Sequence, residues 1–197
     1  MLMQLLMQIL DWLFGFITMA LLARVLMQWT RAPFRNPLGQ FVIAVTDWAV
    51  IPARRLIPSV LGVDLASLLL AWLAQGILQG LILALSSAGV LALVMPTGFV
   101  IVTLLALLEV VRIGLYLLMG VVIVSALLSW VNPYAPLAPL FNLIARPFLS
   151  PLQRIIPLIG GIDLSPMALL LILQVLLTVL ASAQHSLFPV FSPLMIR

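Results

Sequence analysis

The sequence predicts an all-α membrane protein with four transmembrane helices, arranged as two tandem parallel repeats. The first observation is composition: of 197 residues, 65% are hydrophobic and only 7% are charged. A soluble domain carries about 25% charged residues, so a soluble fold would have too few charges to cover its surface. The second is a set of long apolar stretches, and the third is a motif that recurs after 99 residues.

Four apolar stretches approach or exceed the roughly 20 residues that cross a hydrocarbon core. They cover residues 9–29, 65–85, a third stretch that ends at Trp130, and residues 164–184. The first ten residues have neither a basic region nor a small-residue cleavage site. We therefore interpret them as the start of the first span and not as a signal peptide.

The recurring motif is P-x2-R-x2-P-x3-G-x-D-L-x9-Q, and its copies are 99 residues apart. The shared positions are Pro52, Arg55, Pro58, Gly62, Asp64, Leu65 and Gln75 in the first copy, and Pro151, Arg154, Pro157, Gly161, Asp163, Leu164 and Gln174 in the second. Upstream of the motif, Trp29 and Trp130 correspond at an offset of 101. The pattern predicts a repeat over residues 1–85, a connector over 86–108, and a second repeat with a tail over 109–197.

Two basic loops constrain the topology. The loop after the first span contains Arg31, Arg35, Arg54 and Arg55, and the loop after the third contains Arg146 and Arg154. Two spans per repeat place both loops on one side, which the positive-inside rule identifies as the cytoplasm, with both termini in the periplasm. Residues 90–108 are apolar enough for a fifth span, but that span would invert the second repeat. We expect four spans, with 90–108 partly inserted or interfacial.

Each basic loop begins with an amphipathic stretch. In the first, Asp47 and Arg54 lie opposite Phe41 and Trp48 at helical spacing, and Arg146 has the corresponding polar position in the second. Such helices are expected in the headgroup layer, with Pro52 and Pro151 ending them. They either gather lipid headgroups or a protein partner, or they connect the spans without binding anything.

The rest of the motif predicts a device that starts the next span. Gly62 and Gly161 suit a tight bend, and Asp64 and Asp163 stand at the expected N-cap. Pro166 fits the first turn of the fourth span. Arg55 and Arg154 are expected to bond loop carbonyls, lipid phosphate or the same two aspartates. The alternatives are a purely structural cap and a charged partner site.

Polar residues inside the spans need partners. Gln75 and Gln174 lie 11 residues past their aspartates, about 16 Å into the membrane and close to its midplane. They either form ordinary interhelical hydrogen bonds or face each other across a pseudo-two-fold axis and line a polar path. Gln79, one turn beyond Gln75, is compatible with the path.

Some corresponding positions carry opposite charges. Asp11 corresponds to Arg112, and Asp47 to Arg146. One hypothesis is that at least one of these pairs joins the two repeats; the alternative is that all four side chains anchor independently. Arg112 is also three residues from Glu109 and would then pair within its own helix.

The sequence lacks the residues that other functional classes require. The chain has no cysteine, and the sequence shows no glycine-rich phosphate loop, paired catalytic carboxylates or Ser/His arrangement. We therefore predict no enzymatic activity, no metal and no cofactor. The net charge of +4 comes from arginines in loops, which the membrane explains without nucleic acid. Small residues at four-residue spacing, from Gly76 and Gly80 to Ala84 and Ala88, suit helix packing within the chain or in a homo-oligomer.

With Trp29 and Asn36-Pro37 upstream, the duplicated motif resembles the YggT family. Residues 36–42 (NPLGQFV) resemble its first loop and residues 160–166 (GGIDLSP) its second. One departure is that Arg54-Arg55 of the first loop has only Arg154 as its counterpart. The resemblance implies a bacterial inner-membrane protein linked to cell division, assembly of membrane complexes or tolerance of osmotic stress.

The function we expect is that of a non-enzymatic scaffold or assembly factor whose cytoplasmic loops bind anionic headgroups and a still unknown protein partner. The alternative is a small oligomeric channel or transport component for osmotic adaptation. Duplicated halves with glutamines at the midplane suit a polar path, but four spans leave little room for a pore in one copy.

Overall fold

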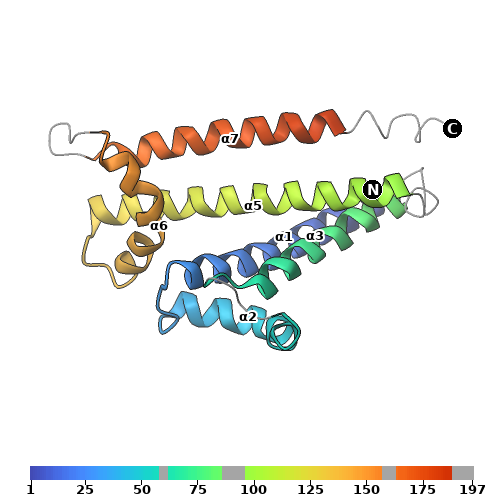
Figure 1. Cartoon of the computed structure of the whole chain (residues 1–197), viewed down its shortest axis with the longest axis horizontal. Helices are drawn as coiled ribbons and strands as arrows, with labels where there is room; N and C mark the ends of the chain where they lie inside the picture. The colour runs from blue at the N-terminus through green and yellow to red at the C-terminus, as the bar shows by residue number, and fades with distance from the viewer. Residues whose placement is uncertain (58–61, 86–95, 157–162, 188–197) are drawn as a thin grey trace.

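The computed structural model describes residues 1–57, 62–85, 96–156 and 163–187, and within them the secondary structure is helical. Figure 1 shows four long helices side by side, with two shorter helices on the side where the first and third long helices end. In chain order the helices are α1 (Leu2–Trp29), α2 (Pro37–Arg54), α3 (Leu65–Leu85), α5 (Pro96–Val131), α6 (Ala138–Gln153) and α7 (Ser165–Leu187).

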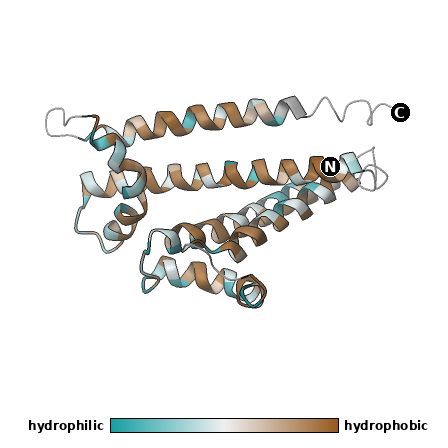
Figure 2. Ribbon diagram, in the orientation of Figure 1, coloured by the Kyte–Doolittle hydropathy of each residue, from teal (hydrophilic) through white to brown (hydrophobic). Residues whose placement is uncertain are grey.

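Four of these helices are long and apolar enough to cross a membrane: α1, α3, α5 and α7. Most of the residues along these helices are hydrophobic (Figure 2). Large apolar side chains remain exposed along them, including Leu13 on α1, Ile77 on α3 and Leu171 on α7. A soluble protein would bury such stretches, so the exposed surface indicates a multi-pass membrane protein, and the predicted four spans are confirmed within the described residues.

The third span is longer than the sequence suggested. Residues 96–108, which we expected in a separate connector, are the first turns of α5. The 36 residues of α5 make a helix about 54 Å long, well beyond a hydrocarbon core of roughly 30 Å. Residues 99–108 contain neither glycine nor proline, so helical backbone hydrogen bonding continues through them into the rest of α5. The rest of the connector, residues 86–95, lies outside the described residues.

Of the two short helices, α2 begins on a side-chain cap, whereas α6 has none. Asn36 caps α2, because its side chain accepts a hydrogen bond from the backbone N–H of Gly39 at 2.8 Å. A Cβ on Gly39 would lie 2.7 Å from backbone atoms of Phe34, so only glycine fits there. The prediction that proline ends each short helix is wrong by two residues, because α2 ends at Arg54 and α6 at Gln153. Pro52 and Pro151 lie inside the last turns of α2 and α6. A proline loses the hydrogen bond to the carbonyl four residues earlier and clashes with that carbonyl, so the residues that follow it can continue the helix.

Packing brings both halves of the chain together. One core cluster joins the end of α1 to α5, α6 and α7, with Met27, Val122 and Ile144 among its buried members. A second joins α1, α2, α3 and α5 around Leu22 and Val50. In Figure 1, α1 and α3 incline relative to α5 and α7, and α2 and α6 share one side of the molecule, here called the α2/α6 side.

The described part of the repeated motif adopts the expected turn. Gly62 has φ of +79°, the left-handed conformation for which glycine is preferred. Its second copy, Gly161, lies outside the described residues, as do Pro58 and Pro157. The first bend prediction is therefore confirmed, and the second stays a prediction.

Candidate functional site

A buried arginine on α1 organises the α2/α6 side. Arg24 is 6% exposed although it belongs to an apolar helix. A charge in such a place requires partners, because desolvation of an unpaired charge is costly. Its Nη1 donates to Asp47 Oδ1 at 2.6 Å and to Thr46 Oγ1 at 2.7 Å. Its Nε lies 3.7 Å from Asp64 Oδ2, so one guanidinium ties α1 to α2 and to the start of α3.

Asp64 is the other centre of this network and is fully buried. Arg54 holds it with two contacts, Nη2 to Oδ2 at 2.6 Å and Nε to Oδ1 at 3.3 Å. Arg54 Nη2 also donates to Gln28 Oε1 at 2.7 Å. On the helix side, the Ser67 hydroxyl donates to Oδ2 at 2.6 Å and the Ser67 N–H to Oδ1 at 3.4 Å. The second contact is that of an N-cap, which confirms the predicted cap at Asp64.

The environment of Asp64 keeps its carboxylate charged. Burial raises the pKa of Asp64, but hydrogen bonds from Arg54 and Ser67 and the charge of Arg54 outweigh it, so the pKa lies below its ordinary value. Two arginines and two aspartates then balance one another. The arrangement is a charge-neutral clamp that joins α1, α2 and α3.

The clamp decides among the alternatives for two predictions. Asp64 was one of three expected partners of Arg55, but Arg55 is exposed and the preceding residue Arg54 makes the contact with Asp64. Asp47 pairs with Arg24 within the same half of the chain and not with Arg146. Sequence analysis assigned no role to Arg24. The sequence did contain a signal for the role of Arg24. This arginine lies near the end of an apolar span, and Asp47 and Asp64 follow in the next two helical segments.

The second half of the chain contains a version of the clamp without arginines. Gln153 corresponds to Arg54, and its Nε2 donates to Asp163 Oδ2 at 2.8 Å. Asp163 Oδ1 accepts from the N–H of Ser165, the first residue of α7, at 2.8 Å. Ser125 stands where Arg24 would be and donates to Asn142 at 2.6 Å. Asp163 therefore contacts the start of its helix as predicted, without an ion pair among the described residues.

Burial raises the pKa of Asp163, but its hydrogen bonds from Ser165 and Gln153 more than compensate, so this pKa also lies below the ordinary value. Arg154, expected as a possible partner of Asp163, is exposed instead. Both motif arginines, Arg55 and Arg154, thus point away from the aspartates that they accompany in the sequence.

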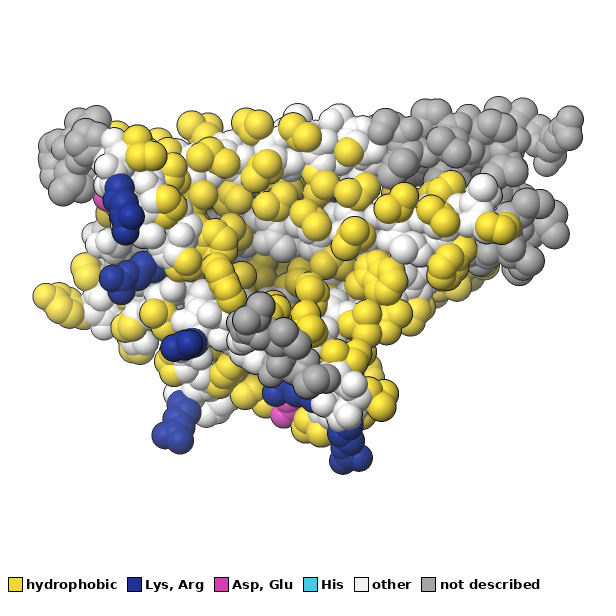
Figure 3. All heavy atoms as spheres, in the orientation of Figure 1, with side chains coloured by type: hydrophobic (Ala, Val, Ile, Leu, Met, Phe, Trp, Pro, Cys, Tyr) yellow, Lys and Arg dark blue, Asp and Glu magenta, His cyan; other side chains and the backbone are white. Residues whose placement is uncertain are grey.

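Five arginines on the α2/α6 side are exposed, and their side chains make no hydrogen bond or ion pair with another residue in the part of the chain that the structure describes. They are Arg31, Arg35, Arg55, Arg146 and Arg154. Figure 3 shows arginine side chains along this side of the molecule, over the ends of the long helices and over α2 and α6. The result is a one-sided concentration of unneutralised positive charge.

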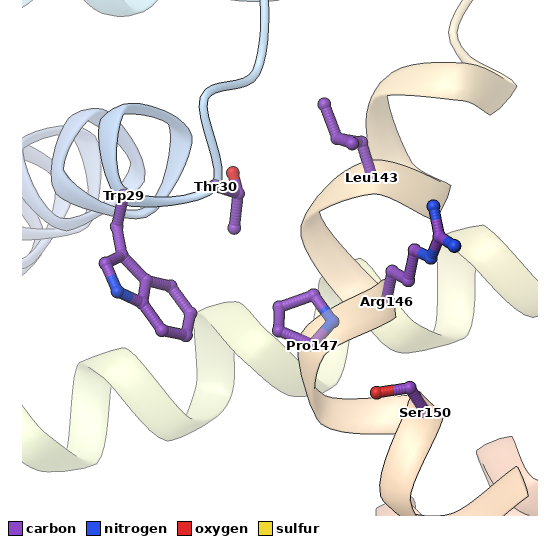
Figure 4. A pocket seen from close by; sticks show the side chains of 6 residues that line it. All are labelled: Trp29, Thr30, Leu143, Arg146, Pro147 and Ser150. Carbon is purple, nitrogen blue, oxygen red and sulfur yellow. The ribbon is translucent and has the colours of Figure 1, made fainter. Parts of the chain in front are cut away.

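A groove of about 340 Å³ lies between the two halves on this side, lined by Trp29, Thr30, Leu143, Arg146, Pro147 and Ser150. The Trp29 ring packs against Phe148 of α6 with centroids 5.7 Å apart. In Figure 4, Trp29 faces Pro147 across the groove, whereas the Arg146 guanidinium points away from Trp29. The polar groups of this groove therefore do not converge on one point.

The intramembrane glutamines do not face each other. Gln75 is 1% exposed, and its Nε2 donates to Thr18 Oγ1 of α1 at 2.8 Å. Gln174 is exposed on α7, and Gln79 is only partly buried. The interhelical hydrogen bond is confirmed for Gln75, and the polar path between the two glutamines within one chain is wrong. Thr18 corresponds to Met119 at the 101-residue offset, so α5 offers Gln174 no hydroxyl at that position.

The predicted ion pairs between halves do not form either. Arg112 pairs with Glu109 at 2.6 Å, as the helical spacing allowed. Gln184 of α7 donates to the other Glu109 oxygen at 3.2 Å. Asp11 is exposed and forms no ion pair with a described residue. Within the described ranges, no three His, Asp or Glu side chains lie close enough to hold a metal ion.

Comparison with known proteins agrees with the earlier resemblance. A model of the CCB3/YggT family matches residues 3–85 and 104–184. The uncharacterised protein YggT of Escherichia coli (strain K12) is 40% identical over 161 residues, which cover 81% of this chain and 80% of that protein. The uncharacterised protein PA0392 of Pseudomonas aeruginosa is 39% identical over 158 residues, with coverage of 79% and 77%.

A further relative from Vibrio alginolyticus, an uncharacterised protein in the proC 3' region, is 34% identical over 163 residues, covering 82% of this chain and 85% of that protein. No solved structure matches the chain significantly. The family match and these relatives cover most of the chain, including the helices that carry the clamp. The chain is a member of the CCB3/YggT family.

Proposed function

We propose that the chain is a non-enzymatic scaffold or assembly factor of the bacterial inner membrane. In this proposal the α2/α6 side faces the cytoplasm and binds anionic phospholipid headgroups, together with a protein partner. The observation that carries the proposal is the contrast between two sets of arginines. Arg24 and Arg54 are paired within the fold, whereas the five exposed arginines have no partner among the described residues.

The chemistry of those five side chains suits phosphate. A guanidinium donates two parallel hydrogen bonds to phosphate or carboxylate oxygens. Arginines next to membrane spans are also concentrated on the cytoplasmic side, where anionic lipids attract them by about 1 kcal/mol each. The same residues therefore support both the orientation and the ligand.

The exposed surface of α2 supports contact with the membrane interface. Phe41, Trp48 and Ile51 are 51%, 70% and 52% exposed on this helix. Indole rings favour the interface, where the ring is partly buried and the N–H remains close to polar groups. A helix that combines such residues with nearby arginines suits the headgroup layer, with its apolar side towards the acyl chains.

We propose that such a scaffold acts in one of the processes that the family resemblance implies: cell division, assembly of membrane complexes or osmotic-stress tolerance. A neutral clamp that rigidifies one end of the bundle, next to a charged exposed surface, suits a protein that holds other components in place.

Reconstitution in vesicles of phosphatidylglycerol and phosphatidylethanolamine tests the binding surface. The measurement is the enrichment of phosphatidylglycerol among lipids that remain bound after extraction. Replacing the five exposed arginines by glutamine is expected to abolish the enrichment, and each single replacement is expected to weaken it about fivefold. Arg112→Gln removes one positive charge outside this side and is the matched control. Unchanged enrichment in the fivefold variant would contradict the proposal.

The alternative function is a small oligomeric channel for osmotic adaptation. One observation favours it: the exposed amide of Gln174 lies about halfway along α7, where several copies in a ring would present it to a shared path. Ion and solute flux through reconstituted protein tests this function. Flux that Gln174→Leu removes would favour the channel, and the absence of flux from correctly oriented protein would exclude it.

A further inference from the structure

The outer face of α7 is unusual for a helix in lipid. Its inner face packs on α5 and α6 through Ser165, Leu169, Leu173 and Leu177, which are all buried. Figure 1 shows α7 at the edge of the bundle, next to α5. The opposite face carries four exposed residues at alternating spacings of four and three: Met167, Leu171, Gln174 and Thr178. This spacing forms one straight stripe along a helix, as in the seam of a coiled coil.

A polar amide stands in the centre of this stripe. Gln174 is nine residues from the start of α7, about 14 Å along the helix and thus near the middle of the membrane. Its side chain makes no hydrogen bond with another described residue, although its backbone oxygen accepts one from Thr178 at 2.9 Å. A primary amide in hydrocarbon favours helix association, because a partner helix supplies the missing hydrogen bonds.

The corresponding position in the first half of the chain has an interhelical partner for its amide N–H, whereas its Oε1 accepts no hydrogen bond from a described residue. Gln75, the counterpart of Gln174, is buried and bonded to Thr18 of the neighbouring helix. In the middle of α7 the buried positions are shifted by one: Leu169 and Leu173 are buried, whereas Ala71 and Gln75 are the buried residues of α3. This shift turns Gln174 outward. No described residue supplies the missing partner of the Gln174 amide, which leaves the amide available to another molecule.

We propose that this outer face of α7 binds α7 of a second copy, so that the two Gln174 side chains hydrogen-bond across a two-fold axis. An amide is both donor and acceptor, so it is complementary to itself in a symmetric pair. A second copy in the same orientation places its amide at the same depth, which an unrelated helix does only by coincidence. No Asp, Glu, Lys or Arg lies on α7, so two copies approach without repulsion between charged side chains.

Cysteine crosslinking of the full-length protein in native membranes tests the proposal, because the chain has no cysteine of its own. Leu171→Cys and Thr178→Cys, which keep Gln174 in place, are expected to form disulfide-linked dimers under mild oxidation. The matched control is Ile77→Cys, which is 61% exposed on α3 and lies at a similar depth, and is expected to remain monomeric. Equal crosslinking at Ile77 and Leu171 would overturn the proposal, as would crosslinking of α7 only to a different membrane protein.

Energy transfer between labelled copies in vesicles measures how strongly the copies associate. Gln174→Leu is expected to weaken dimerisation by about threefold to thirtyfold, the range for an interhelical hydrogen bond in membranes. Gln174→Asn keeps the amide and is expected to retain part of the association. Because Gln174 is exposed, neither change should alter the thermal stability of the monomer. Unchanged association in Gln174→Leu would overturn the role of the amide.

Discussion

Arg24 of α1 and Asp47 of α2 form an ion pair at 2.6 Å, with the arginine almost fully buried and a third of the aspartate side chain exposed. The same guanidinium approaches Asp64, whose own partner is Arg54. These contacts fix α2 against both helices of the first half. Arg24 and Arg54 therefore stabilise the fold on the α2/α6 side, whereas the five exposed arginines remain available for binding.

Removing Arg24 is expected to destabilise the fold. Arg24→Gln leaves Asp47 without its ion pair and leaves Asp64 with Arg54 alone, and breaking a buried pair in this way costs about 3 kcal/mol. Thermal unfolding in detergent measures the loss. Arg55→Gln removes an exposed arginine and should leave the unfolding temperature unchanged. Equal stability of Arg24→Gln and the unaltered protein would show that the clamp contributes nothing to the fold.

Acid is expected to weaken the clamp. The pKa of Asp64 is lowered in the folded protein from its ordinary value of 3.8. Its carboxylate therefore contributes stability above pH 3.8, and that contribution is lost as the pH falls through the lowered pKa. Asp163 acts in the same direction. Unfolding temperatures measured from pH 7 down to pH 3 should fall in the acid range, and Asp64→Asn should show a weaker fall.

The hydrogen bond between Gln75 and Thr18 is expected to stabilise the packing of α3 on α1. Thr18→Val leaves the buried amide of Gln75 without its acceptor and should cost about 1–2 kcal/mol. The double variant Thr18→Val, Gln75→Leu removes both polar groups and should regain most of the stability. A double-mutant cycle on thermal unfolding measures the coupling, and purely additive losses would contradict a direct interaction.

The proposed orientation, with the α2/α6 side in the cytoplasm, rests on the positions of the arginines. Single cysteines at Leu56 and Ile155, which are 84% and 78% exposed on the α2/α6 side, should resist a membrane-impermeant maleimide in intact spheroplasts and react after permeabilisation. A cysteine at Met3, which is 53% exposed near the N-terminus, should react at once. Labelling at Leu56 and Ile155 in intact spheroplasts would place the arginines outside and contradict the assignment.

Features that depend on local chemistry were predictable from the sequence. Apolar length identified the four spans, the preference of glycine for positive φ identified the turn at Gly62, and helical spacing identified the Glu109–Arg112 pair. Each of these predictions rests on residues close together in the chain, so it does not require knowledge of how neighbouring helices pack.

Features that depend on helix rotation were not predictable. Arg54 and Arg55 are adjacent, so their side chains point about 100° apart on a helix. Only Arg55 recurs as arginine in the second copy of the motif, so the sequence favoured Arg55 over Arg54 as a partner of Asp64. The contact is made instead by Arg54 and by Gln153, which differ in charge but both donate hydrogen bonds. Likewise, a shift of one position in the buried stripe of α7 turns Gln174 outward although Gln75 is buried.

The measurement that tests the proposed binding surface most directly is photo-crosslinking in living bacteria. A photoreactive residue at Leu56 or Ile155 stands beside Arg55 or Arg154 and leaves all five exposed arginines in place. Our account predicts adducts with anionic phospholipid or with one recurring protein partner at both positions, and a loss of these adducts when the five arginines are replaced by glutamine. Absence of such adducts at both positions, or adducts that persist without the arginines, would contradict it.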